Sequence, residues 1–317
     1  LIYIILALTF GFTLMTTEIA IGRKTKLSPT RAYGNIDKRF AFIGPISFII
    51  PVIILPYYCV IGGWVIKYVT VFATGQDMAA ADGLFFANFI GQEYAPLVFF
   101  FIFLGLTALI VVLGVEKGIE KVSKYLMPVL ILLAIVICIY IMFIPGAGAG
   151  IKYYLLPDFS KFSFKTVCAA MGQMFYSLSI AMGILYTYGS YIGKDVDLEK
   201  STTQVEIFDT AIAMLAGLMI IPAVFAFSGG NPETLQAGPS LMFITLPKVF
   251  ATMGVGTGAG ILFFVLVLLA ALTSAVSLME TSVSTFMDEL HWGRAKCCIL
   301  MAVIMLVIGT ASSMGYG

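Results

Sequence analysis

Eight apolar stretches of membrane length, separated by polar connections, constrain the fold of this chain more than any other feature. A helix needs roughly 20 mostly apolar residues to cross a bilayer, and such stretches recur throughout the 317 residues. We place them at Leu1 to Ile21, Phe42 to Val71, Ala95 to Val115, Val122 to Ile144, Thr166 to Ile192, Ile207 to Phe227, Gly258 to Val283 and Ala295 to Thr310. The sequence therefore predicts an all-α, polytopic membrane protein, with residues 1–317 forming a single transmembrane domain.

The composition excludes several classes of soluble protein. Hydrophobic residues make up 60% of the chain and charged residues 11%, whereas soluble domains carry about 25% charged residues. No basic run of the kind that binds phosphates occurs, so nucleic acid is not an expected partner. The five cysteines lie in or beside apolar segments, and the only histidine, His291, lies in a polar connection. Neither a disulfide framework nor a zinc site is therefore predicted.

The charges predict the topology. Most of the 18 lysines and arginines lie in alternate connections, after the first, third, fifth and seventh stretches, and the positive-inside rule makes those connections cytoplasmic. The outer connection from Ser228 to Thr257 is long and semi-apolar, and Pro232, Gly238 and Pro247 predict that it is broken into short helical pieces. A lid over an external vestibule and an ordinary packed connection are both open interpretations of it.

The stretch from Ala169 to Tyr191 predicts a broken helix. It is apolar enough to insert, yet it carries Gly172, Gln173, Ser177, Ser179 and Gly183 through its middle. Backbone leaves helical geometry at membrane depth only where it is buried in protein or lines a wet cavity. An interruption frees carbonyls and amides to bind an ion and a small polar substrate, as in secondary transporters. Simple helix packing through small residues is the alternative.

Three acidic residues fall inside the predicted spans, where a charge costs on the order of 3 kcal/mol. Asp209 is the strongest functional candidate, near the cytoplasmic third of its segment. Glu18 lies five residues before Arg23, and Glu280 lies near the end of its span. We interpret these two as interfacial charges at helix ends.

Two further groups bring oxygen atoms into apolar segments. Ala270, Ser274 and Leu278 share one helical face, and Thr273 adds a second hydroxyl. Hydroxyl and carbonyl oxygens suit a hard cation such as sodium, although small residues also serve helix packing. In the second stretch, Tyr58 follows Pro56 in mid-membrane. Its buried hydroxyl needs a partner, which is either a substrate carboxylate or a backbone carbonyl.

Together, these segments resemble the neurotransmitter:sodium symporter family, and specifically its short prokaryotic amino-acid transporters. The resemblance runs from end to end in several ordered motifs. They are EIAIGR (18–23), PYY with GGW (56–64), GQMFYSLSIAMG (172–183) followed by TYGSY, IPAVFAF (221–227), FITLPKVF (243–250), and LTSAVSLME (272–280) followed by DEL.

The resemblance implies an inverted-repeat sodium symporter fold with a broken central helix. The first span here is similar to the family's second helix, and the eighth span to its ninth. The chain is therefore expected to be truncated at both ends, without the family's first helix and the helices after the ninth. Because the first helix normally supplies sodium and substrate ligands, the chain as it stands is not expected to transport.

The resemblance also implies the site residues. Matching the family's motifs, the substrate-binding residues are Tyr58, Tyr176, Ser179, Met182, Ser274 and Leu278. The sodium ligands are Ser177 and Asp209 at the first site, and Ala270, Thr273 and Ser274 at the second. The residues that surround chloride in chloride-dependent relatives match Tyr3, Gln173, Ser177 and Asp209, and the serine that completes that chloride site is Ala213 here. A fixed carboxylate at Asp209 can replace chloride in balancing the charge of sodium.

We therefore predict sodium-coupled symport of an amino acid across the cell (inner) membrane by alternating access, independent of chloride and without an organic cofactor. Tyr176 and Met182 stand where many members have phenylalanine, and a flexible methionine can reshape a pocket for a large hydrophobic or aromatic substrate. An amino-acid sensor on the same fold and an ion channel are the alternatives. An intramembrane hydrolase is disfavoured, because Asp209 has neither a histidine nor a second aspartate within the spans.

Overall fold

A computed structural model of the chain describes residues 1–228, 238–251 and 256–315. Within these ranges every regular element is helical, as predicted. The short elements are α3 (Pro29–Ile36), η2 (Lys38–Phe40), α5 (Asp77–Ala80), α6 (Phe85–Ile90), η3 (Val115–Glu120), α9 (Ala147–Leu155), η4 (Phe159–Lys161), η6 (Leu241–Thr245) and α13 (Leu246–Ala251).

Seven helices in the described residues are long and apolar enough to cross a membrane. The first consists of α1 (Ile2–Leu6), η1 (Ala7–Gly11) and α2 (Phe12–Thr25). The other six contain α4 (Ile43–Ala73), α7 (Ala95–Val112), α8 (Lys121–Met142), α12 (Leu198–Phe227), α14 (Gly256–Leu290) and α15 (Arg294–Met314). The remaining predicted span, the fifth (Thr166 to Ile192), is a pair of shorter helices, α10 (Phe164–Ser177) and α11 (Ile184–Tyr191), so the predicted broken helix is confirmed.

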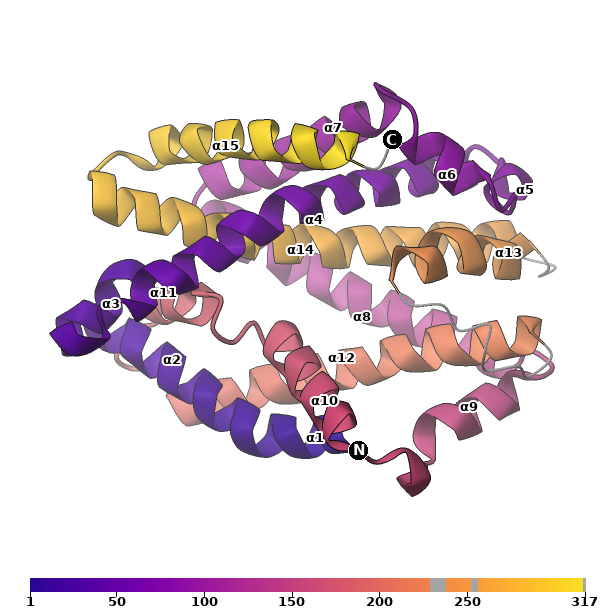
Figure 1. The fold of residues 1–317 in the computed structure, drawn as a ribbon, viewed down its shortest axis with the longest axis horizontal. Helices are drawn as coiled ribbons and strands as arrows, with labels where there is room; N and C mark the ends of the chain where they lie inside the picture. Colours follow the sequence, from indigo (N-terminus) through magenta and orange to yellow (C-terminus); the bar gives the residue numbers. More distant parts are fainter. Residues whose placement is uncertain (229–237, 252–255, 316–317) are drawn as a thin grey trace.

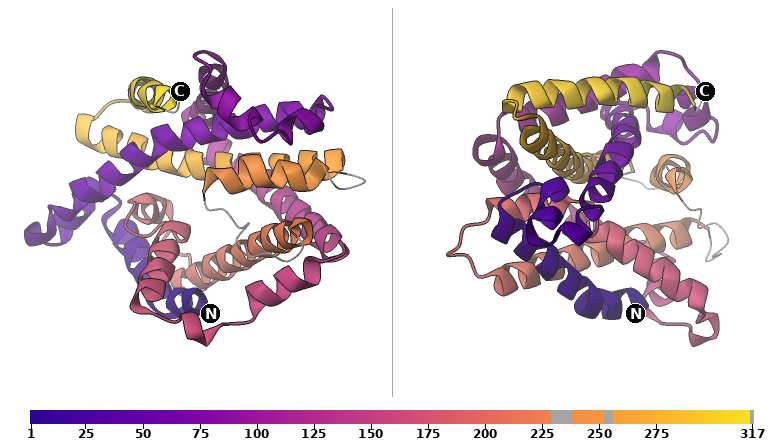
Figure 2. Two further views of the ribbon diagram at one scale, coloured as in Figure 1. Left: turned by 45° about the vertical axis from the view of Figure 1, so that its right-hand side comes forward. Right: turned by 60° about the vertical axis from the view of Figure 1, so that its left-hand side comes forward.

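The helices form two packed groups. Helices α4, α7, α14 and α15 contact one another and share the larger hydrophobic core, while α2 packs on α11 and α1 packs on α10 around a smaller core. Helix α8 contacts both α14 and α12 and so joins the two groups. Figures 1 and 2 show this division in all views, with the N-terminus in the second group and the C-terminus at the end of α15.

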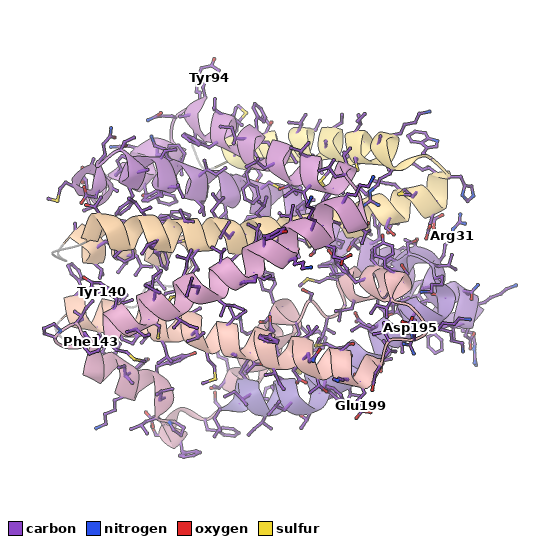
Figure 3. The ribbon with its side chains drawn as sticks, turned by 180° about the vertical axis from the view of Figure 1, so that it is seen from behind. Arg31, Tyr94, Tyr140, Phe143, Asp195 and Glu199 are labelled. Atoms are coloured by element: carbon purple, nitrogen blue, oxygen red, sulfur yellow. The ribbon has the colours of Figure 1, made fainter. Side chains whose placement is uncertain are left out.

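The four basic connections gather at one end of the molecule. Arg23 and Lys26 donate to the carbonyls of Val196 and Ile192, both at 2.5 Å, and so tie the first of these connections to the third. Arg31 pairs with Glu289 at the end of α14. Figure 3 shows Arg31, Asp195 and Glu199 at this end and Tyr140 and Phe143 at the opposite one. This arrangement agrees with the alternating topology that the charges predict.

The outer connection from Ser228 to Thr257 is described only in part, because residues 229–237 and 252–255, including Pro232, lie outside the described ranges. Its described part is buried against the larger core, where Phe243 stacks on Phe86 at a centroid distance of 5.1 Å. Pro247 is the second residue of α13, which follows η6 directly, so the helical segment Leu241–Ala251 continues past this proline and is not broken there.

The break between α10 and α11 spans six residues, from Leu178 to Gly183. Ser179, Ala181 and Gly183 have φ values of 56°, 64° and 74°, in the left-handed region. For a residue with a side chain, this conformation costs about 1–2 kcal/mol. The segment therefore persists only because surrounding groups hold it.

Glu18 of α2 is one such group. Its Oε1 accepts the backbone amide of Ala181 at 2.9 Å, its Oε2 is buried without a partner in the described residues, and the side chain is only 6% exposed. The interpretation of Glu18 as an interfacial charge is therefore wrong. The short distance along the chain from Glu18 to Arg23 suggested a position near the membrane surface. It did not predict burial, because the turn of α2 that carries Glu18 packs against the break.

Close backbone contact brings α2 up to the break. A Cβ at Gly22 would lie 2.1 Å from the carbonyl oxygen of Tyr186 in α11, so only glycine permits this approach. Close approach through small residues is the usual way in which membrane helices associate. The contact places Glu18, one turn earlier, beside the unwound segment.

We expect Glu18→Ala to destabilise the protein by about 1–3 kcal/mol, because it leaves the Ala181 amide buried and unpaired. Glu18→Gln retains an accepting oxygen and should be milder. Thermal unfolding in detergent measures both, with Glu199→Ala, at an exposed position, as the control. Equal unfolding temperatures for Glu18→Ala and the unsubstituted protein would show that the carboxylate does not support the break.

Candidate functional site

A cavity of about 920 Å³ lies at the break, between α4, α8, α10–α11 and α14. It brings together residues that are far apart in the sequence. The predicted site residues that line it are Tyr58, Gln173, Tyr176, Ser177, Ser179, Met182, Ala270, Thr273, Ser274 and Leu278. Every predicted substrate-binding residue therefore faces one space, together with most of the predicted sodium ligands.

Tyr58 and Ser274 face each other across this cavity. Tyr58 lies half-buried in α4, and its hydroxyl is within reach of the Ser274 side chain on α14. Ser274 is itself exposed to the cavity. The partner of the tyrosine in this structure is thus a hydroxyl, rather than the carbonyl or substrate carboxylate considered from the sequence. Both hydroxyls can turn towards a polar molecule in the cavity.

The break supplies backbone oxygens to the same region. Within the described residues, no backbone amide donates to the carbonyls of Ser179, Ile180 and Ala181. In a continuous helix these carbonyls would bond to amides one turn later. Unpaired carbonyls at membrane depth need a polar partner, and Ser179 is the one of these three residues that lines the cavity.

The predicted second sodium site is one turn of α14. The Thr273 hydroxyl donates to the carbonyls of Ala270 at 3.0 Å and Leu269 at 3.2 Å. The carbonyl of Ala270 and the hydroxyls of Thr273 and Ser274 therefore lie on one turn that lines the cavity. Oxygen atoms of these types suit a hard cation.

The predicted first sodium site joins α10 to α12. The Ser177 hydroxyl donates to Oδ2 of Asp209 at 2.8 Å. The hydroxyl of Tyr3 lies beside this pair and beside Thr210, yet the hydroxyls of Tyr3 and Thr210 are both buried without a hydrogen bond in the described residues. Buried polar groups are normally paired, so these two hydroxyls remain free to bond to a further polar group.

Gln173 connects this region to a second cavity. It lines the large cavity and also a space of about 390 Å³ that includes Tyr3, Tyr154 and Ala213. Ala213 thus lies near Tyr3 and Gln173, as the resemblance implies, with a methyl group in place of a hydroxyl. Asp209, which accepts the Ser177 hydroxyl, is the acidic residue beside Tyr3.

Glu280 was also misjudged from the sequence. It is fully buried, its Oε1 accepts the Tyr191 hydroxyl at 2.6 Å, and it pairs with Arg294. Arg294 also donates to the carbonyl of Val111 at 2.9 Å. The interpretation of Glu280 as an interfacial charge is wrong, because the pair ties α11 to α14, α15 and the end of α7.

Glu206 was missed because our predicted span began at Ile207. The helix α12 begins at Leu198, and the Glu206 side chain is only 3% exposed. Its Oε1 has no partner in the described residues. The charged residues before the apolar stretch lower the local hydropathy, so the hydropathy pattern does not show that this helix begins at Leu198.

Comparison with known proteins agrees with this geometry. Residues 88–315 match the model of the sodium:neurotransmitter symporter family. An uncharacterized sodium-dependent transporter of Bacillus subtilis, YhdH, is 33% identical over 100% of this chain and 70% of its own length. An uncharacterized sodium-dependent transporter of Haemophilus influenzae is 32% identical over 98% of this chain and 70% of its own length.

A solved structure shares the fold. The crystal structure of MhsT in complex with L-phenylalanine has a TM-score of 0.91 and 37% sequence identity, and the match covers 100% of this chain and 72% of that one. The chain is thus a multi-pass protein of the cell (inner) membrane, related to transporters rather than to enzymes. The sequence match, the relatives and the shared fold together show that this chain belongs to the sodium:neurotransmitter symporter family.

Proposed function

We propose that the protein couples the uptake of a neutral amino acid to sodium by alternating access. The observation that carries this proposal is the cavity at the helix break, where hydroxyls and unpaired carbonyls meet apolar side chains at membrane depth. A polar cluster of this kind suits an occluded site for a small zwitterion, whereas a channel needs a continuous pore. Membership of a sodium symporter family supports the same function.

We infer that the substrate is a large hydrophobic or aromatic amino acid. Tyr58 is the proposed donor to its carboxylate, and Ser179, Ser274 and Leu278 complete the pocket. Tyr176 and Met182 are the proposed contacts to the side chain, because both line the cavity and methionine adapts to bulky groups. The likeness to a protein solved with L-phenylalanine supports this class of substrate.

Sodium is the proposed coupling ion at two places. Ser177 and Asp209 are the proposed ligands at the first, and Ala270, Thr273 and Ser274 at the second. Ligands shift a conformational equilibrium only through different affinities for its states. Coupling therefore requires that sodium and the amino acid each bind more tightly when the other is present.

We also propose that transport does not need chloride. The Asp209 carboxylate is bonded to Ser177 beside Tyr3 and near Gln173, which lines the adjoining cavities. A fixed negative charge close to a sodium ion in a low-dielectric site contributes several kcal/mol, so a mobile chloride is not required there.

The full-length protein in proteoliposomes tests this function directly. We expect radiolabelled phenylalanine or leucine to accumulate under an inward sodium gradient in chloride-free buffer, and not under a potassium gradient. Flux and binding should be measured together. Substrate that binds but never accumulates under any gradient would replace the symporter with a sensor, and an absolute need for chloride would refute the role of Asp209.

Asp209→Asn removes the fixed charge and keeps the shape of the side chain. We expect uptake either to be lost or to become responsive to added chloride, since chloride can then supply the missing negative charge. The measurement is initial uptake at varied chloride with sodium held constant. Asp195→Asn, in an exposed connection, is the matched control and should transport normally. Unchanged, chloride-insensitive uptake by Asp209→Asn would contradict the proposal.

Thr273→Val replaces the hydroxyl by a methyl group of similar size. Loss of one oxygen ligand, at about 1–2 kcal/mol, should raise the sodium concentration for half-maximal binding by roughly five- to thirtyfold. Scintillation proximity binding at varied sodium measures this shift. Thr285→Val is the matched control and should leave sodium binding unchanged. Thr285 is a buried threonine further along the same helix, and its hydroxyl bonds only to its own backbone. Similar sodium affinities for the two variants would argue against a sodium ligand at Thr273.

A further inference from the structure

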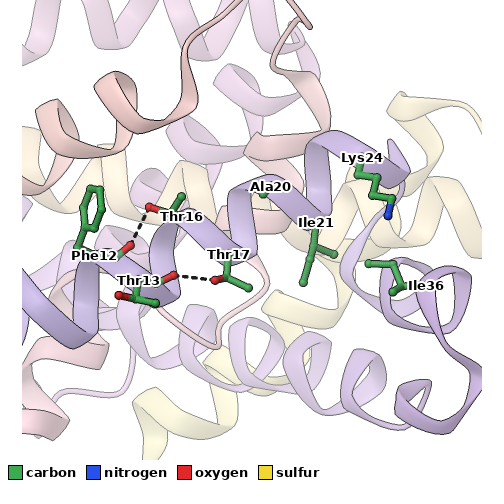
Figure 4. A pocket seen from close by; sticks show the side chains of 8 residues that line it. All are labelled: Phe12, Thr13, Thr16, Thr17, Ala20, Ile21, Lys24 and Ile36. Carbon is green, nitrogen blue, oxygen red and sulfur yellow. Dashed lines mark hydrogen bonds between the residues drawn. The ribbon is translucent and has the colours of Figure 1, made fainter.

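An apolar groove runs along the exposed face of α2, opposite the face that carries Glu18. It is a shallow, open groove of about 490 Å³, lined by α2 together with Ile36 of α3 (Figure 4). Thr13, Thr17 and Ile36 are exposed on this face, whereas Glu18 is buried on the other. The groove is therefore separate from the cavity at the helix break.

The threonine hydroxyls along the groove are bonded to their own helix. The hydroxyls of Thr13, Thr16 and Thr17 each donate to the carbonyl four residues earlier, at 2.9, 2.8 and 2.7 Å. Figure 4 shows two of these bonds along the helix. Because the donors are satisfied by their own backbone, Phe12 and Ile36 complete a surface that suits hydrocarbon.

The length and the end of the groove limit what can occupy it. From Phe12 to Lys24 the helix rises by about 18 Å, a little more than one leaflet of a hydrocarbon core that is about 30 Å thick. Lys24 lies at the end where the basic connections gather, which the positive-inside rule predicts to be cytoplasmic.

Lys24 is the basic residue that lines this end of the groove. It is exposed and makes no hydrogen bond or ion pair within the described residues. Its basic neighbours Arg23 and Lys26 are bound to backbone carbonyls, and Arg39 is paired with Asp37. An occupant of the groove therefore meets an unpaired ammonium group at the membrane surface.

We propose that the groove binds one acyl chain of an anionic phospholipid from the cytoplasmic leaflet, with the phosphate on Lys24. A lipid brings a phosphate to the height of Lys24 whenever its chain lies along Thr13 and Thr17. A helix, or a second copy of this chain, would have to bring a carboxylate to the same height. Charge complementarity and the one-leaflet length thus favour the lipid.

Lipid retention by the full-length protein tests this proposal without any measurement of transport, so its failure and that of the transport proposal are distinguishable. Native mass spectrometry should show one tightly held phosphatidylglycerol and weaker binding of phosphatidylcholine with the same chains. Lys24→Gln should weaken retention of phosphatidylglycerol about fivefold, which is the effect of one lysine at a membrane surface. Lys194→Gln, at another exposed lysine of this end, should leave it unchanged.

A second variant tests the groove itself. Thr17→Trp fills the groove and should displace both lipids, whereas Thr203→Trp on α12 should displace neither. Equal retention of the two lipids by the unsubstituted protein, or no effect of Lys24→Gln, would overturn the proposal. A photoreactive residue at Thr13 provides a further measurement: cross-linking to lipid supports the proposal, and cross-linking to a segment of the same protein or to a second copy overturns it.

Discussion

The structure depends on the satisfaction of backbone hydrogen bonds inside the membrane. Seven spans meet this requirement by being continuous helices, and the pair α10–α11 does not. Its break is possible because the Glu18 carboxylate accepts the amide of Ala181 and because glycine at position 22 lets α2 come close. Ser179, whose carbonyl accepts no backbone amide, lines the cavity, so the strained backbone of the break forms part of the wall of the site.

The site is built from a rigid half and a strained half. Helices α4 and α14 pack through the larger core and carry Tyr58, Thr273 and Ser274 on continuous backbone. The break carries Ser179 on backbone with positive φ. A ligand in the cavity would therefore contact continuous helices on one side and backbone in a strained conformation on the other.

The sequence predicted the features that depend on residues close together along the chain. Hydropathy located the spans, and glycines with polar residues in the stretch from 169 to 191 located the break. The burial of a charged residue was harder to predict. Glu18 and Glu280 lie near the ends of their predicted spans, which suggested interfacial positions, but both are buried by the helices that pack against them. No sequence pattern predicted the unpaired hydroxyl of Thr210 or the burial of Glu206, because both depend on how α12 packs. The candidate site residues come from the ordered motifs of the family resemblance rather than from periodicity.

The shortness of the two half-helices has a consequence for biosynthesis. Helix α10 has 14 residues and α11 has 8, so by the rise of 1.5 Å per residue neither crosses a core of about 30 Å alone. They can enter the membrane only as one apolar stretch. Because the chain is made from its N-terminus, α2 and its carboxylate are already in the bilayer when that stretch arrives. Glu18, which supports the break, is therefore synthesised before α10 and α11. Helix α14, which completes the wall of the cavity, is synthesised after them.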